Sequence, residues 1–151
     1  MSSNIQIYRT HSSEETIAVG RELAAMLIPP KMMVLRGELG AGKTTLVKGI
    51  ATALDAADAE EVTSPTFTLL HEYVGRREGR EVQLYHLDLY RLETQRELNT
   101  LGLEELLASD SIVLIEWGEK FPWVTERCDG EIALEHAGGD ERRITVRFRE
   151  G

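Results

Sequence analysis

Residues 37–44, with the sequence GELGAGKT, match the phosphate-binding pattern G-x-x-x-x-G-K-[ST] without a spacing error. In such a loop, backbone N–H groups of the glycine-rich turn and of the following helix N-terminus surround the phosphates of a bound nucleotide. The Lys43 amine reaches the β- and γ-phosphates, and the Thr44 hydroxyl is a ligand for Mg²⁺. The pattern constrains the fold because it requires a strand before the loop and a helix after it.

The residues on both sides of this loop match that requirement. Residues 32–35, MMVL, form an apolar run of strand length, and residues 45–54 place Leu46, Ile50 and Leu54 on one face of a helix. An accidental glycine-rich turn would need neither neighbour. The sequence therefore predicts a strand, a phosphate-binding loop and a helix, in that order.

Strand-like and helix-like patterns fill the rest of the chain. Ser12 and Glu15 form a capping box at the start of a helix that should end at Pro29-Pro30. Residues 93–107 carry a second helical rhythm, with Gly102 as an interruption. The further expected strands are residues 5–8, 66–74, 82–88, 112–115, 132–134 and 144–148.

The turns between these strands indicate how they pair. Residues 75–79 and 138–140 are turn-like, so each should close an antiparallel hairpin, and residues 118–129 are expected to form a loop. Residues 112–115 are continuously apolar, which is typical of a parallel strand buried on both faces. The predicted fold class is α/β: a P-loop NTPase-like mixed sheet with a parallel core, antiparallel hairpins and flanking helices.

The composition predicts one globular domain over residues 1–151. A chain of this length buries about 70% of its unfolded surface, enough for its own core. No stretch approaches the ~20 apolar residues of a membrane helix, and the polar start MSSN is unlike a signal peptide. The single cysteine, Cys128, is expected to be an ordinary thiol in a reducing compartment. We therefore expect a cytoplasmic protein without membrane contact.

The net charge of −9 argues against direct binding of nucleic acid. The chain has 17 basic and 26 acidic residues, whereas proteins that grip nucleic acid usually carry a basic excess or stripe. The one dense basic cluster, residues 76–80, looks like a turn. If RNA takes part in the function, we expect a partner to hold it.

Two acidic residues at strand ends are candidates for organising Mg²⁺. Glu116 follows the apolar run 112–115, and Asp88 closes the run 82–87 in the same manner. A P-loop site needs such an acid, and Mg²⁺ keeps several waters, so Thr44 with one or two carboxylates suffices. The alternative is that an acid at a strand end simply faces water.

Other polar and aromatic residues have weaker signals. Ser64 and Thr66 offer hydroxyl groups to phosphate or to metal-bound water, although a Ser-Pro turn that opens a strand explains them equally well. His71 and His86 are expected to be packing or surface residues rather than catalytic ones. Trp117 is expected to lie in the core or against a partner, with stacking on a base as the alternative. Arg91 is expected to form a salt bridge after Asp88, with a phosphate contact as the alternative.

Four motifs in this order resemble one known family. Their sequences are GELGAGKTT, SPTFT, YHLDLYR and IEW, at residues 37–45, 64–68, 85–91 and 115–117. Together they resemble TsaE, also called YjeE, a family of small bacterial ATPases, over residues 12–147. The P-loop is widespread, so YHLDLYR and IEW supply the specificity. The resemblance implies a role in making N6-threonylcarbamoyladenosine at position 37 of tRNAs that read codons starting with A. The implied partner is the TsaB–TsaD heterodimer, with tRNA contacted only through that complex.

The resemblance also implies roles for individual residues. It implies ATP and Mg²⁺ as the bound ligands and Lys43, Asp88 and Glu116 as the catalytic group. Thr44 and Glu116 would hold Mg²⁺, with Asp88 as a second acid near the metal-bound or attacking water. The loop 64–66 would respond to the nucleotide. The residues implied to contact ATP are Ser13, Gly40, Ala41, Gly42, Lys43, Thr44, Thr45, Thr66 and Arg142.

Weak hydrolysis by the chain alone is expected, because no obvious arginine finger lies near the motif. Turnover should rise with TsaB–TsaD. A first alternative is a small-molecule kinase that uses the turn at residues 76–80 as a lid. A second is a nucleotide-switched module of the GTPase type, but the chain has no Asn-Lys-x-Asp motif for guanine, which favours ATP.

Overall fold

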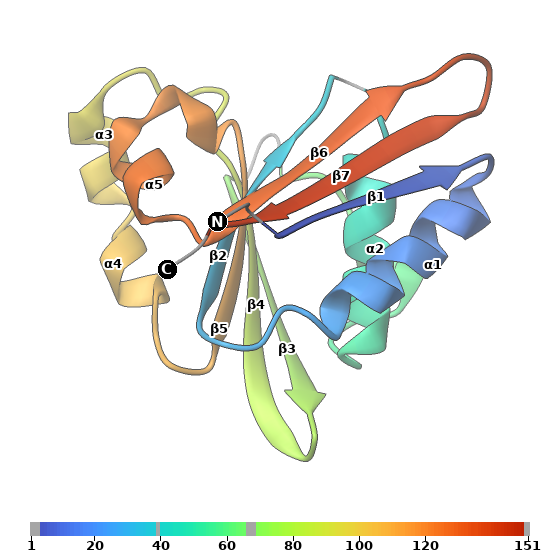
Figure 1. Ribbon diagram of the computed structural model, residues 1–151. Helices are drawn as coiled ribbons and strands as arrows, with labels where there is room; N and C mark the ends of the chain where they lie inside the picture. The colour runs from blue at the N-terminus through green and yellow to red at the C-terminus, as the bar shows by residue number, and fades with distance from the viewer. Residues whose placement is uncertain (1–3, 39, 66–68, 150–151) are drawn as a thin grey trace.

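The computed structural model describes residues 4–38, 40–65 and 69–149, which include one seven-stranded mixed sheet (Figure 1). The strand order is β1-β7-β6-β2-β5-β4-β3. β2 pairs in parallel with β5 and β6, and β4 pairs in parallel with β5, whereas β1–β7, β6–β7 and β3–β4 are antiparallel. The strands are β1 (Asn4–Thr10), β2 (Lys31–Arg36), β3 (Leu70–Arg77), β4 (Arg80–Asp88), β5 (Ser111–Glu116), β6 (Gly130–His136) and β7 (Arg142–Phe148). The expected parallel core with two antiparallel hairpins is confirmed.

Helices cover both faces of the sheet. Figure 1 shows α1 (Ser13–Ala24) and α2 (Lys43–Ala53) on one side and α3 (Gln95–Thr100), α4 (Leu103–Leu106) and α5 (Pro122–Arg127) on the other. Two short 3₁₀ helices, η1 (Ala59–Glu61) and η2 (Gly118–Lys120), complete the elements. Each helical layer has its own buried apolar cluster. β5 is buried at all six positions, as its continuous apolar sequence predicts.

The two helices on the P-loop side pack very closely. A Cβ added at Gly20 would lie 2.3 Å from the Leu46 carbonyl oxygen, and one added at Gly49 would lie 2.1 Å from the Ile17 carbonyl oxygen. Only glycine therefore fits at either position, and the backbones of α1 and α2 approach each other directly. This contact fixes the P-loop helix against α1.

The start of α1 is as expected, but its end is not. Ser12 is the N-cap, and its hydroxyl accepts a hydrogen bond from the Glu15 N–H at 3.1 Å. The helix ends at Ala24, before Pro29-Pro30 is reached. The Arg77 guanidinium from β3 donates to the carbonyls of Ala24 and Ala25, at 2.8 and 2.9 Å, and so satisfies the groups that a continued helix would have bonded.

Two further expectations need correction. Residues 118–129 are not a simple loop, because they contain η2 and α5, and Pro122 opens α5 where its missing N–H costs nothing. The β3–β4 turn is also tighter than expected. β3 continues to Arg77, and the turn is Glu78-Gly79, with φ of 52° and 80°, as in two-residue hairpins. The expected interruption at Gly102 is confirmed, since it separates α3 from α4.

The parallel strands bring three carboxyl ends to one edge of the sheet. Glu116 of β5 is in register with Leu35 of β2 on one side and Asp88 of β4 on the other. The β3–β4 turn lies at the opposite edge, as Figure 1 shows, because Arg80 is eight residues, or about 26 Å, before Asp88. The turn at residues 76–80 is therefore too far away to be a lid. Among the described residues, no helix is long and apolar enough to cross a membrane.

Candidate active site

The P-loop joins the end of β2 to the start of α2. Gly42 is the N-cap of α2 with φ of 104°, a left-handed conformation that glycine adopts readily. No side chain caps this helix end, and its first turn contains no acidic residue. The N–H groups and positive dipole end of α2 are thus available to an anion, as phosphate binding requires.

The Lys43 side chain is held by two oxygens in this state. Its Nζ donates to the Gly37 carbonyl at 2.6 Å and lies 3.2 Å from Oε1 of Glu116. The Lys43 side chain is only 11% exposed. Its ammonium therefore lies over the loop.

The two candidate acids lie side by side and are buried. Asp88 and Glu116 are register partners on parallel strands, and they are 4% and 3% exposed. His86 shares their face of the sheet, because it precedes Asp88 by two residues on β4. The His86 Nε2 lies 2.6 Å from Oε2 of Glu116, and Asp88 accepts a hydrogen bond from the Tyr90 N–H at 2.9 Å. Neither acid simply faces water.

The Glu116 carboxylate is stabilised in its charged form. Burial alone would raise the pKa of this group. The hydrogen bond and charge of His86, together with the ammonium of Lys43, outweigh burial and hold the Glu116 pKa below its usual range. The site therefore keeps a carboxylate at neutral pH despite its burial.

A cavity of about 450 Å³ connects these groups with the P-loop. It is lined by Gly40, Gly42, Lys43, Thr44, Thr45, Ser64, Asp88, Tyr90, Glu116 and Trp117. Within the described ranges, no group of three or more His, Cys, Asp or Glu side chains could hold a metal alone. The donor set of one hydroxyl and two carboxylates nevertheless fits Mg²⁺, which takes few protein ligands and completes its shell with phosphate oxygens and water.

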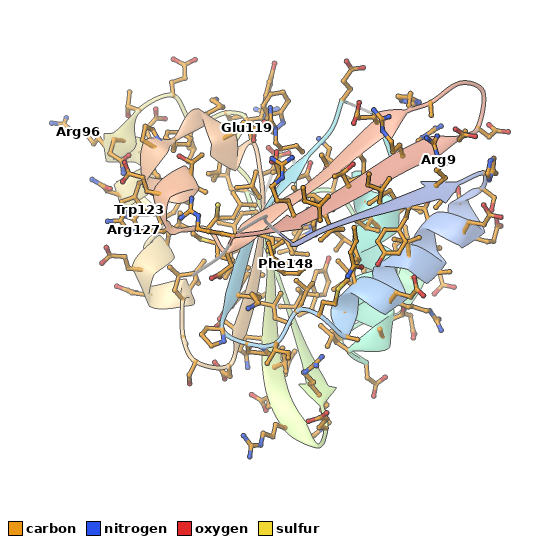
Figure 2. The ribbon with its side chains drawn as sticks, viewed as in Figure 1. Arg9, Arg96, Glu119, Trp123, Arg127 and Phe148 are labelled. Carbon is orange, nitrogen blue, oxygen red and sulfur yellow. The ribbon has the colours of Figure 1, made fainter. Side chains whose placement is uncertain are left out.

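A second cavity, of about 380 Å³, opens on the other side of the P-loop. Its lining residues are His11, Ser12, Ser13, Thr16, Gly40, Gly42, Thr45, Asp140 and Arg142. Ion pairs join the two sides of this cavity: Glu141, just before β7, pairs with Arg9 of β1 at 3.2 Å and with His11 at 3.0 Å. Figure 2 shows Arg9 on β1 beside the β6–β7 hairpin. Gly40, Gly42 and Thr45 line both cavities, so the two cavities adjoin at the P-loop and the start of α2.

Most of the expected site residues come together. Lys43, Thr44, Asp88 and Glu116 line one cavity, while Ser13 and Arg142 line the other. Ala41 differs, since its side chain is fully buried away from both cavities and its N–H bonds to the Glu38 carbonyl at 3.0 Å. Thr66 lies outside the described residues, and Ser64 lines the larger site cavity.

Three residues contribute to the site beyond the set expected from the sequence. His86 was expected to be a packing or surface residue; it is fully buried but also contacts Glu116, and its strand alternation with Asp88 was the available signal. Trp117 packs against the core and also lines the cavity, with its ring 5.1 Å from that of Tyr90 and 5.6 Å from the Lys43 Nζ. No local pattern would have placed Tyr90 there.

The chain is similar in sequence and in fold to several known proteins. Residues 10–144 match the family model described as threonylcarbamoyl adenosine biosynthesis protein TsaE. The chain is 39% identical over 138 residues to the TsaE protein of Bacillus subtilis, covering 91% of this chain and 82% of that protein. It is 36% identical to TsaE of Treponema pallidum, with 91% and 96% covered. The crystal structure of YdiB from Bacillus subtilis superposes with a TM-score of 0.71 at 33% identity, over 98% of this chain and 88% of that one.

Proposed function

The chain belongs to the TsaE family of tRNA threonylcarbamoyladenosine biosynthesis proteins, and from this premise we propose that it is a Mg²⁺-dependent ATPase. In this proposal it acts in the cytoplasm with the TsaB–TsaD heterodimer. The complex forms N6-threonylcarbamoyladenosine at position 37 of tRNAs that read codons starting with A. The chain contacts tRNA only through that complex.

One observation carries the ATPase proposal: the Lys43 ammonium at the P-loop is paired with a buried carboxylate, Glu116, at the end of the neighbouring strand. A nucleotide phosphate would take over Lys43 and release Oε1 of Glu116. The metal-holding residues would then be Thr44 and Glu116, and Mg²⁺ would supply charge neutralisation for the phosphates. Asp88, the register partner of Glu116 on the neighbouring strand, would orient a water molecule.

The smaller cavity supports the placement of the nucleoside. It lies on the α1 side of the P-loop and combines polar side chains from the helix start and from the β6–β7 hairpin. Ser13 and Arg142 would contact the sugar or base there. Because the chain has no Asn-Lys-x-Asp motif, we expect ATP to be bound in preference to GTP. Competition between the two nucleotides for the site checks this preference.

Slow hydrolysis by the isolated chain also follows from the cavity lining. Among the described residues that line the larger site cavity, Lys43 is the one cation, against two carboxylates. Phosphoryl transfer depends on neutralising charge in the transition state, and a missing cationic group costs roughly 10³-fold or more in rate. A partner that completes the site would therefore accelerate turnover.

The test is ATP turnover titrated with the TsaB–TsaD heterodimer, with and without tRNA. We expect weak turnover that rises saturably with the heterodimer and is lost in Lys43→Ala. Rapid turnover by the chain alone that the heterodimer leaves unchanged would contradict the proposal. Incubation of metabolites with labelled ATP, followed by mass spectrometry, covers the kinase alternative, which would require a labelled product other than phosphate.

A further inference from the structure

His86 has two ring nitrogens in very different surroundings. Nε2 lies 2.6 Å from Oε2 of Glu116, whereas Nδ1 is buried without a hydrogen-bond partner among the described residues. The side chain is completely buried near the carboxyl end of β4. On its face of the sheet it lies between Leu84 and Asp88 on β4, and its register partners are Leu114 on β5 and His71 on β3.

A buried histidine at this position would lower the stability of the fold if its side chain only filled space. A buried polar atom without a hydrogen-bond partner is destabilising, and leucine would fill similar space without that cost. Among the described residues, the single hydrogen-bond partner of the His86 side chain is Glu116. We therefore look for the role of His86 in its hydrogen bond to the Glu116 carboxylate, which offsets the burial of the unpartnered Nδ1.

The two oxygens of Glu116 have different partners. Oε1 faces Lys43, and Oε2 accepts from His86. Nucleotide phosphates would draw Lys43 away and leave Oε1 available to the metal ion or to one of its waters. His86 would then be the protein donor that still fixes the carboxylate. Its Nε2 can donate this hydrogen bond whether the imidazole is neutral or charged.

We propose that His86 is a positioning residue that holds Oε2 of Glu116, so that Oε1 is presented to the divalent cation when Lys43 moves to the nucleotide. The inference rests on the proposed function, because it needs Mg–ATP at this site. Removing a residue that orients a metal ligand typically weakens metal affinity by about 10–100-fold.

Three variants of β4 separate positioning from packing. His86→Leu removes the donor while keeping an apolar volume, and His86→Gln keeps an N–H donor that can reach Glu116. Tyr85→Leu is the matched control, because Tyr85 is the adjacent residue and points to the other face of the sheet. The affinity of each ATP complex for Mn²⁺ is measured by electron paramagnetic resonance. ATP affinity in EDTA and the melting temperature are measured alongside.

We expect His86→Leu to weaken Mn²⁺ affinity roughly 10-fold or more, with ATP affinity in EDTA changed by less than about 2-fold. His86→Gln should restore Mn²⁺ affinity to within about 3-fold of wild type, and Tyr85→Leu should leave it unchanged. In a Glu116→Gln background, His86→Leu should have almost no further effect, because the two residues act as one unit.

The opposite results would overturn the inference. These are an unchanged Mn²⁺ affinity in folded His86→Leu, an equal loss in the Glu116→Gln background, or a joint fall of ATP affinity, Mn²⁺ affinity and melting temperature in both His86 variants. A wild-type protein that binds no Mg–ATP would overturn the proposed function and this inference with it. Normal binding by wild type beside an unaffected His86→Leu overturns the inference alone.

Discussion

Lys43 and Glu116 form a largely buried ion pair at the P-loop, with Nζ 3.2 Å from Oε1. The pair joins the two halves of the site, since Lys43 begins α2 and Glu116 ends β5. Because of this ion pair, a bound nucleotide would compete with the Glu116 carboxylate for the Lys43 ammonium group. In the proposed function, binding of ATP and rearrangement of Glu116 would therefore be one coupled event, whose parts are separated by variants of Lys43 and Glu116.

Lys43→Ala should abolish tight ATP binding, because the ammonium is the one cation lining the larger site cavity among the described residues. We expect a loss of affinity of roughly 100-fold or more, as for a charge-assisted contact worth about 3 kcal/mol. Isothermal titration calorimetry with ATP measures the loss. Arg36→Ala is the control, since Arg36 pairs with Glu119 and Glu131 outside both site cavities. Full ATP affinity in Lys43→Ala would contradict the P-loop assignment.

Glu116→Ala should impair turnover more than nucleotide binding. The carboxylate is assigned to the metal and not to the phosphates, so its loss should lower Mg²⁺-dependent turnover by about 100-fold. ATP affinity measured in EDTA should change by less than about 3-fold, because Lys43 keeps its contact with the phosphates. Steady-state kinetics and calorimetry on the same preparation compare the two. Equal losses in both quantities would mean that Glu116 acts mainly in nucleotide binding.

The depressed pKa of Glu116 makes part of the folding stability pH-dependent. A carboxyl whose pKa is lower in the folded protein stabilises it above the unfolded pKa of about 4.3, and this contribution is lost as the pH falls through the folded pKa. The free energy of unfolding of wild type minus that of Glu116→Gln should therefore be constant from neutral pH to about 5 and should decrease below about 4.3. Urea unfolding across this range measures it. A difference that stays constant down to pH 3 would refute the assigned pKa direction.

Trp117 should report nucleotide binding by fluorescence. Its ring centroid lies 5.6 Å from the Lys43 ammonium, which ATP is expected to draw away. The chain has two tryptophans, and the other, Trp123 of α5, is on the far side of the sheet from α2, next to Arg127 (Figure 2). Trp123→Phe should keep the ATP-dependent change in emission, whereas Trp117→Phe should lose it. The reverse pattern would show that the change arises away from the P-loop.

Local patterns predicted much of the fold and the chemical half of the site. The P-loop follows from a glycine-rich motif, and β5 follows from a continuous apolar run. The two acids were found because each comes directly after a strand-like run. The end of α1 could not be predicted in this way, because Arg77, 53 residues from Ala24, supplies its terminal hydrogen bonds. The short helix α5 was missed because six residues give too little periodicity to separate a helix from a loop.

The second cavity depends on contacts that are distant in the sequence. Its wall forms because Glu141, in the turn between β6 and β7, pairs with His11, 130 residues earlier. Family resemblance pointed to Ser13 and Arg142, but only the pairing of β1 with β7 explains why they face one space. His86 is the intermediate case, since alternation places it beside Asp88 whereas its contact with Glu116 requires the β4–β5 register.

A crystal structure of the protein with Mg²⁺ and a non-hydrolysable ATP analogue tests the central claim most directly. The account predicts phosphates at the N-terminus of α2, Lys43 moved from Glu116 to a phosphate oxygen, and the metal ion next to Thr44 and Glu116. The nucleoside should occupy the cavity lined by Ser13 and Arg142. A nucleotide bound elsewhere, or a Lys43–Glu116 pair that persists with the nucleotide bound, would contradict it.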